Sequence, residues 1–331
     1  MNRQVPPWAL GATLYMPATR SDLSEVVFGQ KLPGLRSLVV CLEDAVSEVD
    51  VGSALLNLEQ LLTLIDRRGG RPDTCPLLFV RPRDAQMASV LNEWALMKHV
   101  DGFVVPKLTL ANLNDWEEAV TNPTLLLMPT LETPDVYNPV AMSELGEALK
   151  SGLDQRIIAL RIGGNDLLGC LGLRRSPTMT LYDTPMGYVI PMLAGVMGAL
   201  GFSLTAPVFE QLASPELLRR ELELDIAHGL VGKTAIHPSQ TNIIHEALSV
   251  SQDDLESAQL ILQDVSPAVF RHNDVMCEPA THGRWAQNIV ERAQWYGVQQ
   301  ASDKRCVSPY RQSEKRSGTQ SYESSLMTGL S

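Results

Sequence analysis

The stretch TLLLMPTLETP (residues 124–134) is a short apolar run that ends on an acidic residue, Glu132. A second stretch, IIALRIGGND (residues 157–166), has the same arrangement and ends on a Gly-Gly-Asn-Asp segment that contains Asp166. Short, nearly all-apolar runs are typical of strands that are covered on both sides, as in a parallel sheet. These two stretches therefore predict parallel strands with functional groups at their carboxyl ends.

The same pattern occurs eight times, and most runs are followed by a longer segment with apolar residues three and four positions apart. This alternation is expected of parallel strands joined by crossover helices. The runs cover residues 13–16, 37–42, 77–80, 102–105, 124–128, 157–162, 203–206 and 234–236, and the helical segments include residues 51–68, 86–99, 110–120, 141–151, 186–200 and 215–228.

A closed barrel and an open doubly wound sheet both fit this alternation. Polar residues follow nearly every run; in a barrel they converge on one mouth, whereas an open sheet gathers them at one switch point. We therefore predict an α/β protein with a (β/α)8 TIM barrel over residues 1–250. Residues 251–300 are predicted to form a C-terminal helical lid, with helices over 251–265 and 279–296. The polar segment 301–331 is predicted to be disordered.

The composition is that of an ordinary globular protein, with 44% hydrophobic and 20% charged residues in a chain of 331. Acidic residues number 38 against 27 basic ones, and this net charge of −11 argues against a nucleic-acid partner. The five cysteines form no CxxC pair and are predicted to be reduced thiols. Neither a signal peptide nor an apolar run of the roughly 20 residues that span a membrane is found, which predicts a cytoplasmic protein without a membrane partner.

Glu132 and Asp166 follow the fifth and sixth runs, so a barrel would place them next to each other at its mouth. Two carboxylates, with room left for water and substrate, suit Mg²⁺. The alternative is that each acid only caps the turn or helix that follows it. Glu132 lies in an otherwise apolar stretch, and Asp166 follows a glycine pair that lets the backbone approach a ligand. Both features favour a Mg²⁺ site.

Arg81 ends the third run and is predicted to face the same mouth. Its planar guanidinium suits a substrate carboxylate or a developing enolate. The alternative is an ion pair with Glu43 or Asp44, which follow the second run, and the two interactions are compatible. Lys107 is a further candidate for binding the substrate, and a Schiff base on Lys107 is the less favoured possibility.

Seven motifs, in order along the chain, resemble those of the citrate lyase beta-subunit and malyl-CoA lyase family of Mg²⁺-dependent barrels: LYMPATRSDL, VVCLEDAV, LLFVRPRD, GFVVPKL, MPTLETP, LRIGGNDL and GLVGKTAIHPSQ. The resemblance implies that Glu132 and Asp166 ligate Mg²⁺. It also implies that Arg81 binds a substrate carboxylate or enolate, and that Glu43 and Asp44 support the site.

The resemblance further implies that Arg20 helps to bind the substrate or the phosphates of an acyl carrier. Three positions depart from the family pattern: Cys41 stands in place of an acid, Ala18 in place of a glycine, and Cys277 in place of the lid Asp of the CoA-ester lyases. The last departure leaves open whether CoA thioesters are used.

The activity implied by the resemblance is the cleavage or formation of a carbon–carbon bond in a 2-oxo or 2-hydroxy acid, free or as its CoA thioester. The enolate would be stabilised by Mg²⁺ and Arg81. The general base stays open among Glu43, Asp44, Glu278 and a metal-bound water. A lid shared between subunits implies a homo-oligomer, a trimer or a multiple of it. A phosphoenolpyruvate-type transferase and a non-catalytic assembly subunit are the alternatives on the same fold.

Overall fold

The structure, a computed structural model, describes residues 5–299 and contains one sheet of eight parallel strands. Every apolar run predicted as a strand overlaps one of them. The neighbours in the sheet follow the order β7-β6-β5-β4-β3-β2-β1-β8. The strands are β1 (Gly11–Pro17), β2 (Ser37–Cys41), β3 (Leu77–Arg81), β4 (Gly102–Val105), β5 (Leu126–Leu131), β6 (Leu160–Ile162), β7 (Leu204–Thr205) and β8 (Gly232–Ala235).

Backbone hydrogen bonds between β7 and β8 close the sheet into a barrel. The amide of Val231 donates to the carbonyl of Leu204 at 2.9 Å, and the amide of Ala206 donates to the carbonyl of Gly232 at 2.7 Å. Residues Ala206 and Lys233 form a parallel bridge at the same seam. The predicted (β/α)8 barrel is therefore confirmed, and the open sheet is excluded.

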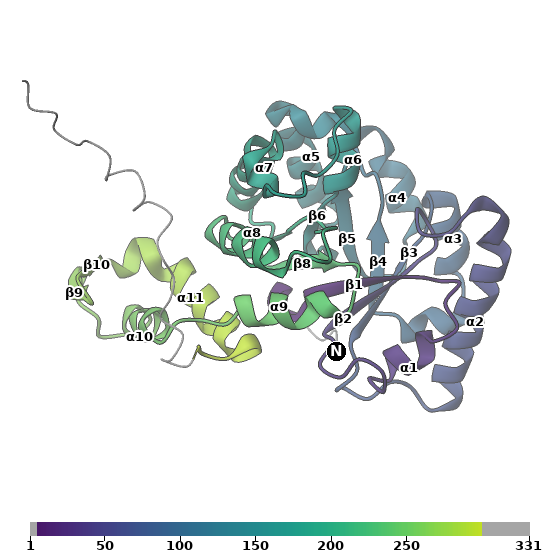
Figure 1. The fold of residues 1–331 in the computed structure, drawn as a ribbon, viewed down its shortest axis with the longest axis horizontal. Coiled ribbons are helices and arrows are strands. Elements are labelled where there is room, and N and C mark those ends of the chain that lie inside the picture. Colours follow the sequence, from purple (N-terminus) through teal and green to yellow (C-terminus); the bar gives the residue numbers. More distant parts are fainter. Residues whose placement is uncertain (1–4, 300–331) are drawn as a thin grey trace, which may run out of the picture.

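Helices surround the barrel on its outside (Figure 1). On α2, for example, Ala54, Leu58, Leu61, Leu62 and Ile65 recur every three or four residues and are buried, so one face of the helix packs on the strands. The helices before the C-terminal region are α1 (Leu23–Val27), α2 (Val51–Arg67), α3 (Ala85–Asn92), α4 (Leu113–Ala119), α5 (Pro139–Gly152), α6 (Gly164–Cys170), α7 (Met186–Ala199), α8 (Pro215–Ala227) and α9 (Ser239–Ala247).

Several predicted segments differ in their bounds from the elements observed, and two in the barrel are examples. The helix expected over residues 86–99 ends at Asn92, because Trp94 has an extended backbone and a separate 3-10 turn covers Ala95–His99. The strand expected over residues 157–162 is shortened to β6, with Ile157 forming only an isolated bridge to Leu127.

The C-terminal region forms a small unit of its own from α10 (Gln252–Ile261), β9 (Phe270–His272), β10 (Val275–Cys277) and α11 (Pro279–Tyr296). Its buried core is separate from that of the barrel and includes Ala258, Ile261 and Ile289. The antiparallel hairpin of β9 and β10 turns at Asn273 and Asp274, which both have positive φ. The helical pattern of the sequence did not predict this hairpin.

The last turn of α11 attaches this unit to the barrel at the amino ends of the strands. The hydroxyl of Tyr296 donates to the carbonyl of Trp8, just before β1, and Arg36, just before β2, donates to the carbonyl of Trp295. The unit projects sideways beyond α9 (Figure 1). It is thus anchored on the face opposite the mouth, and its role as a lid for another subunit stays a prediction.

Cys41, Cys75, Cys170 and Cys277 are free thiols, in agreement with the prediction of reduced cysteines. Cys306 and the segment 301–331, predicted to be disordered, lie outside the described residues. Between residues 5 and 299, no helix has the length and apolar character needed to cross a membrane.

Candidate active site

A cavity of about 630 Å³ lies at the carboxyl ends of the strands and brings most of the predicted site residues together. We call it the mouth cavity. In a barrel of this kind the loops at this end carry the reactive groups. The mouth cavity is lined by, among others, Tyr15, Asp44, Arg81, Thr130, Glu132, Arg161, Gly163, Asp166 and Thr234.

Arg81 lies at the centre of the acidic groups, at the end of β3. Its Nη2 lies 2.8 Å from Glu43 Oε2, 3.0 Å from Glu132 Oε1 and 3.6 Å from Asp44 Oδ2. Burial alone would lower the pKa of Arg81, but the Glu132 carboxylate raises it above its ordinary value, so the cation is retained. The Nε of Arg81 is buried and has no hydrogen-bond partner among the described residues. The predicted ion pair therefore exists, and one buried donor of Arg81 is left without a partner among the described residues.

Glu132 follows β5 directly and is 4% exposed. Its Oε1 accepts hydrogen bonds from Arg81 and, at 2.8 Å, from the backbone amide of Lys107. Burial raises the pKa of Glu132 to about 7, although Arg81 opposes the shift. A cation beside this carboxylate would stabilise its charged form.

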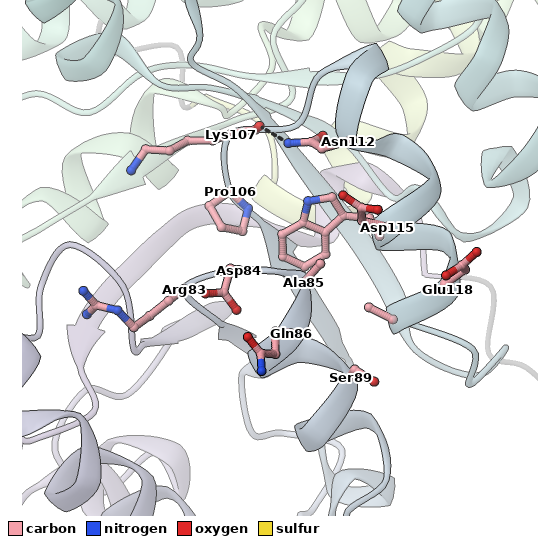
Figure 2. A pocket seen from close by; sticks show the side chains of 12 residues that line it. Arg83, Asp84, Ala85, Gln86, Ser89, Pro106, Lys107, Asn112, Asp115 and Glu118 are labelled. Carbon is pink, nitrogen blue, oxygen red and sulfur yellow. Dashed lines mark hydrogen bonds between the residues drawn. The ribbon is translucent and has the colours of Figure 1, made fainter.

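Lys107 contributes both its backbone and its side chain. Its φ of 50° lies in the left-handed region, which is uncommon for a residue other than glycine and is often found at functional sites. The side chain of Asn112 donates to the carbonyl of Lys107 at 3.0 Å and supports this conformation (Figure 2). The Nζ atom donates to Glu43 at 2.6 Å. Burial would lower the pKa of Lys107, but Glu43 raises it, which argues against a neutral, Schiff-base-forming amine.

Asp166 is half-buried in the first turn of α6 and forms no ion pair with any residue between 5 and 299. Burial and the nearby Asp44 carboxylate raise its pKa. Together, four carboxylates (Glu43, Asp44, Glu132 and Asp166) face Arg81 and Lys107, and Arg161 is a third cation deeper in the same cavity, so the formal surplus is one negative charge. A divalent cation would be attracted to this surplus.

The described residues contain no group of three or more His, Cys, Asp and Glu side chains arranged as a metal site. Mg²⁺ usually takes only one or two carboxylates and completes its shell with water and substrate. Glu132 and Asp166 could supply these two ligands.

Arg20 does not join this cluster. Its exposed guanidinium forms a bidentate pair with Asp22, at 2.8 and 2.7 Å, and Asp22 also pairs with Lys31. The loop after β1 nevertheless places Arg20 on the mouth side of the barrel. Its predicted role in binding substrate or carrier phosphates stays a prediction.

A second depression, of about 780 Å³, lies between α3 and α4 on the outer rim (Figure 2). It is larger than the mouth cavity and shares Lys107 with the Arg81 cluster, but its other charged lining residues are Arg83, Asp84, Asp115 and Glu118. Because the interacting charges gather in the mouth cavity, we place the chemistry there and not in the larger depression.

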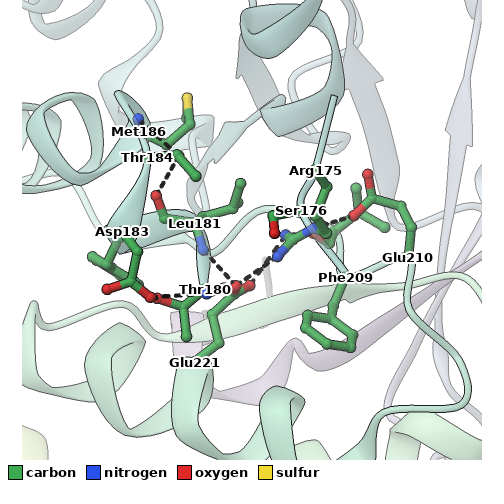
Figure 3. A network of polar contacts seen from close by, with 12 residues as sticks. Arg175, Ser176, Thr180, Leu181, Asp183, Thr184, Met186, Phe209, Glu210 and Glu221 are labelled. Atoms are coloured by element: carbon green, nitrogen blue, oxygen red, sulfur yellow. Dashed lines mark hydrogen bonds and ion pairs between the residues drawn. The ribbon is translucent and has the colours of Figure 1, made fainter. Parts of the chain in front are cut away.

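A buried network of charges holds the long connection between α6 and α7 against α8. Glu221 on α8 accepts from Arg175 Nη1 at 2.6 Å and from the amide of Leu181 at 2.9 Å (Figure 3). Its other oxygen accepts from Lys233 of β8 at 2.9 Å, and Lys233 also donates to Asp225 at 2.8 Å. This network anchors the segment that follows Asp166.

Arg161, Tyr15 and Thr234 line the mouth cavity but were not among the predicted site residues. Arg161 lies within the apolar run of residues 157–162, where it was counted as part of the strand. A single charged residue in an otherwise apolar strand was the available signal, since a buried charge is rarely kept without a partner.

A substitution at Gly163 tests whether the Glu132 carboxylate lies against this residue. A Cβ at residue 163 would lie 2.3 Å from Glu132 Cβ and 2.5 Å from Glu132 Oε2. We expect Gly163→Ala to displace the carboxylate and to destabilise the protein by about 1–3 kcal/mol, as overpacking does. Gly195→Ala on α7, with no atom within 4 Å of the added Cβ, serves as the control and should leave the melting temperature unchanged or higher. Equal melting temperatures for Gly163→Ala and the parent would contradict the contact.

Comparison with known proteins identifies the family. Residues 4–298 match the model of a carbon–carbon bond lyase family of the TIM-barrel fold. A search of curated protein sequences gave no significant match.

Solved structures show the same fold. Protein CitE from Mycobacterium tuberculosis, in complex with magnesium, acetoacetate and coenzyme A, is 20% identical over 87% of this chain and 99% of its own, with a TM-score of 0.62. The citrate lyase beta subunit complexed with oxaloacetate and magnesium from the same organism is 20% identical over 73% of this chain and 98% of its own, with a TM-score of 0.53. A citrate lyase from Burkholderia xenovorans LB400 is 15% identical over 89% of this chain and 94% of its own, with a TM-score of 0.68. With the family model spanning the barrel and the C-terminal unit, the chain belongs to the carbon–carbon bond lyases of the TIM-barrel fold.

Proposed function

We propose that this lyase cleaves or forms a carbon–carbon bond in a 2-oxo or 2-hydroxy carboxylic acid, with Mg²⁺ held by Glu132 and Asp166. The observation that carries the proposal is the surplus of negative charge around Arg81 in the mouth cavity. The mycobacterial structures described with magnesium and oxaloacetate or acetoacetate support the same ligand chemistry. Mg²⁺ bound here would act as a Lewis acid on the carboxylate and adjacent oxygen of the substrate.

The residues of the chain then have separate tasks. The unpartnered Nε of Arg81 can donate to the oxygen on which enolate charge develops, and Glu43 and Glu132 fix the guanidinium in place. Lys107 orients Glu132 through its backbone amide and Glu43 through its Nζ. Besides the proposed metal ligand Glu132, Glu43 and Asp44 are the described carboxylates that pair with Arg81, and either could move a proton at the reacting carbon.

The finer features of the proposal concern the acyl carrier, the assembly and the compartment. Coenzyme A in one of the similar structures supports CoA thioesters as substrates, with Arg20 on their phosphates. A homo-oligomer, a trimer or a multiple of it, would let the C-terminal unit of one subunit reach the mouth of another. The proposed location of the protein is the cytoplasm.

A partial reaction tests the proposed chemistry without knowledge of the full substrate. An enzyme that stabilises the enolate of a 2-oxo acid should exchange the methyl protons of pyruvate with D₂O in the presence of Mg²⁺, as followed by NMR. Removal of Mg²⁺ with EDTA should abolish the exchange. If exchange with Mg²⁺ does not exceed that of buffer alone, the proposed function is wrong.

Replacement of the two ligands tests the metal site directly. Glu132→Gln and Asp166→Asn each replace a charged oxygen with a neutral one, and we expect each to weaken Mg²⁺ binding by at least about tenfold in calorimetric titration. Asp135→Asn, an exposed neighbour on the following turn, is the control and should bind Mg²⁺ like the parent. Unchanged Mg²⁺ affinity in both ligand variants would show that the ion binds elsewhere.

A further inference from the structure

Arg161 is a buried cation without a carboxylate partner. Its side chain points into the barrel from β6 and is 1% exposed. Its guanidinium donates to the hydroxyl of Thr234 and, at 3.7 Å, to the sulfur of Met128, and it lies 5.2 Å from the ring centroid of Tyr15. All three neighbours are neutral. Within residues 5–299, no acidic side chain forms an ion pair with Arg161.

This environment differs from that of two other deeply buried cations, Arg175 and Lys233. Arg175 is paired with Glu210 and Glu221, and Lys233 with Glu221 and Asp225. Burial of a charge without a partner is strongly unfavourable, and it lowers the pKa of Arg161 below its ordinary value. An anion brought in by a ligand would relieve this penalty.

The site of Arg161 opens toward the proposed metal ligands. In the sheet register Arg161 pairs with Thr130, and Glu132 stands two residues further along the same strand. Since a strand rises about 3.3 Å per residue, Glu132 lies roughly 6–7 Å above Arg161 along the barrel. Gly163, two residues after Arg161, lines the same cavity, and its lack of a side chain leaves room for Glu132, which packs directly against it.

Thr130 provides a second hydrogen-bond donor at the same level of the barrel as Arg161. Its hydroxyl is buried beside Arg161 and has no hydrogen-bond partner among the described residues. A guanidinium and a hydroxyl that both lack an anionic partner are the groups that bind a carboxylate well. Both residues line the mouth cavity together with Glu132 and Asp166.

We propose that Arg161 and Thr130 bind a second carboxylate of the substrate, which makes the enzyme specific for an acid with two carboxylates. One carboxylate and its adjacent oxygen would bind the Mg²⁺ that Glu132 and Asp166 hold. The other carboxylate would extend into the barrel and contact Arg161. This inference rests on the proposed function, because it takes the first carboxylate to be held by the metal.

The test compares pyruvate with oxaloacetate, which differ by one carboxylate, in calorimetric titrations with Mg²⁺ present. We expect the parent to bind oxaloacetate roughly 10- to 100-fold more tightly, as a charge-assisted hydrogen-bond pair provides. In Arg161→Met this preference should disappear while the affinity for pyruvate stays within about threefold. Equal affinity of the parent for both acids would overturn the second-carboxylate site alone. Failure to bind either acid would overturn the proposed function as well.

Two further variants separate recognition from folding. Arg161→Met removes an unpaired buried charge, so its melting temperature should hold or rise. Arg156→Met, the matched control, removes donors to the carbonyls of Leu125 and Val120 and should lower the melting temperature without changing the preference for oxaloacetate. Thr130→Val gives an independent measurement, because it should weaken oxaloacetate binding several-fold and leave pyruvate binding as it is. Parental preference in both Thr130→Val and Arg161→Met would exclude the proposed contacts.

Discussion

Replacing Glu221 with Gln should lower the free energy of unfolding by about 3–5 kcal/mol, the loss expected when one partner of a buried ion pair is removed. Glu221 is 0% exposed and is the only carboxylate that both Arg175 and Lys233 contact within the described residues. An amide cannot neutralise these cations, and its NH₂ group would face them. Urea unfolding of the two proteins measures the difference.

Glu223→Gln is the matched control, because it makes the same change of charge on an exposed face of the same helix. Its unfolding free energy should stay within about 0.5 kcal/mol of the parent. If Glu221→Gln behaved like Glu223→Gln, the network would not stabilise the connection that follows Asp166.

The effect of Glu221→Gln should depend on pH. Burial alone would raise the pKa of Glu221, but Lys233 and Arg175 hold it at about 2, below its ordinary value of 4.5. A carboxyl whose folded-state pKa is lowered contributes its stability above the unfolded value and loses it as the pH falls toward the folded value. The difference between parent and variant should therefore be full above pH 4.5 and shrink between pH 4.5 and 2.

Arg81→Lys should reduce the rate of the Mg²⁺-dependent exchange of pyruvate protons by an amount equivalent to about 2–4 kcal/mol of transition-state stabilisation. Lysine keeps the charge near Glu43 and Glu132 but lacks the Nε donor that Arg81 leaves without a partner. Mg²⁺ affinity should survive, since Arg81 is not a ligand. The rate is measured per folded molecule, together with the melting temperature.

Arg83→Lys is the control, because Arg83 lies two residues further on and faces the outer rim rather than the mouth cavity. It should exchange pyruvate protons at the parental rate. A destabilised Arg81→Lys variant with parental exchange would assign Arg81 a purely structural role in pairing Glu43.

The sequence predicted the fold well because each strand of a barrel is a separate short apolar run with polar residues at its end. The same rule indicated Arg81, Glu132 and Asp166, which lie at the end of a strand or just after it. It did not predict the contact between Arg81 and Glu132, since these side chains meet across the mouth from strands that are not neighbours in the sheet.

Two other features depended on information that periodicity lacks. Arg161 was not predicted as a site residue because it lies within an apolar run, and the strand pattern does not tell which residues of a run point into the barrel. The β9–β10 hairpin has mostly exposed or half-buried side chains and therefore little hydrophobic pattern. Its Asn273–Asp274 turn, with two residues at positive φ, was the local signal for it.

The attachment of α11 beside β1 also constrains the order in which the chain can fold during synthesis. Tyr296 and Trp8 are 288 residues apart in the sequence. The barrel can close only when β8 has been synthesised and pairs with β1. The ribosome therefore exposes the first strand long before either of its late partners exists. Contacts of such long separation form slowly, and an unpaired strand edge is prone to aggregate in the meantime. The edge of β1 that β8 later covers thus stays unpaired while most of the barrel is synthesised.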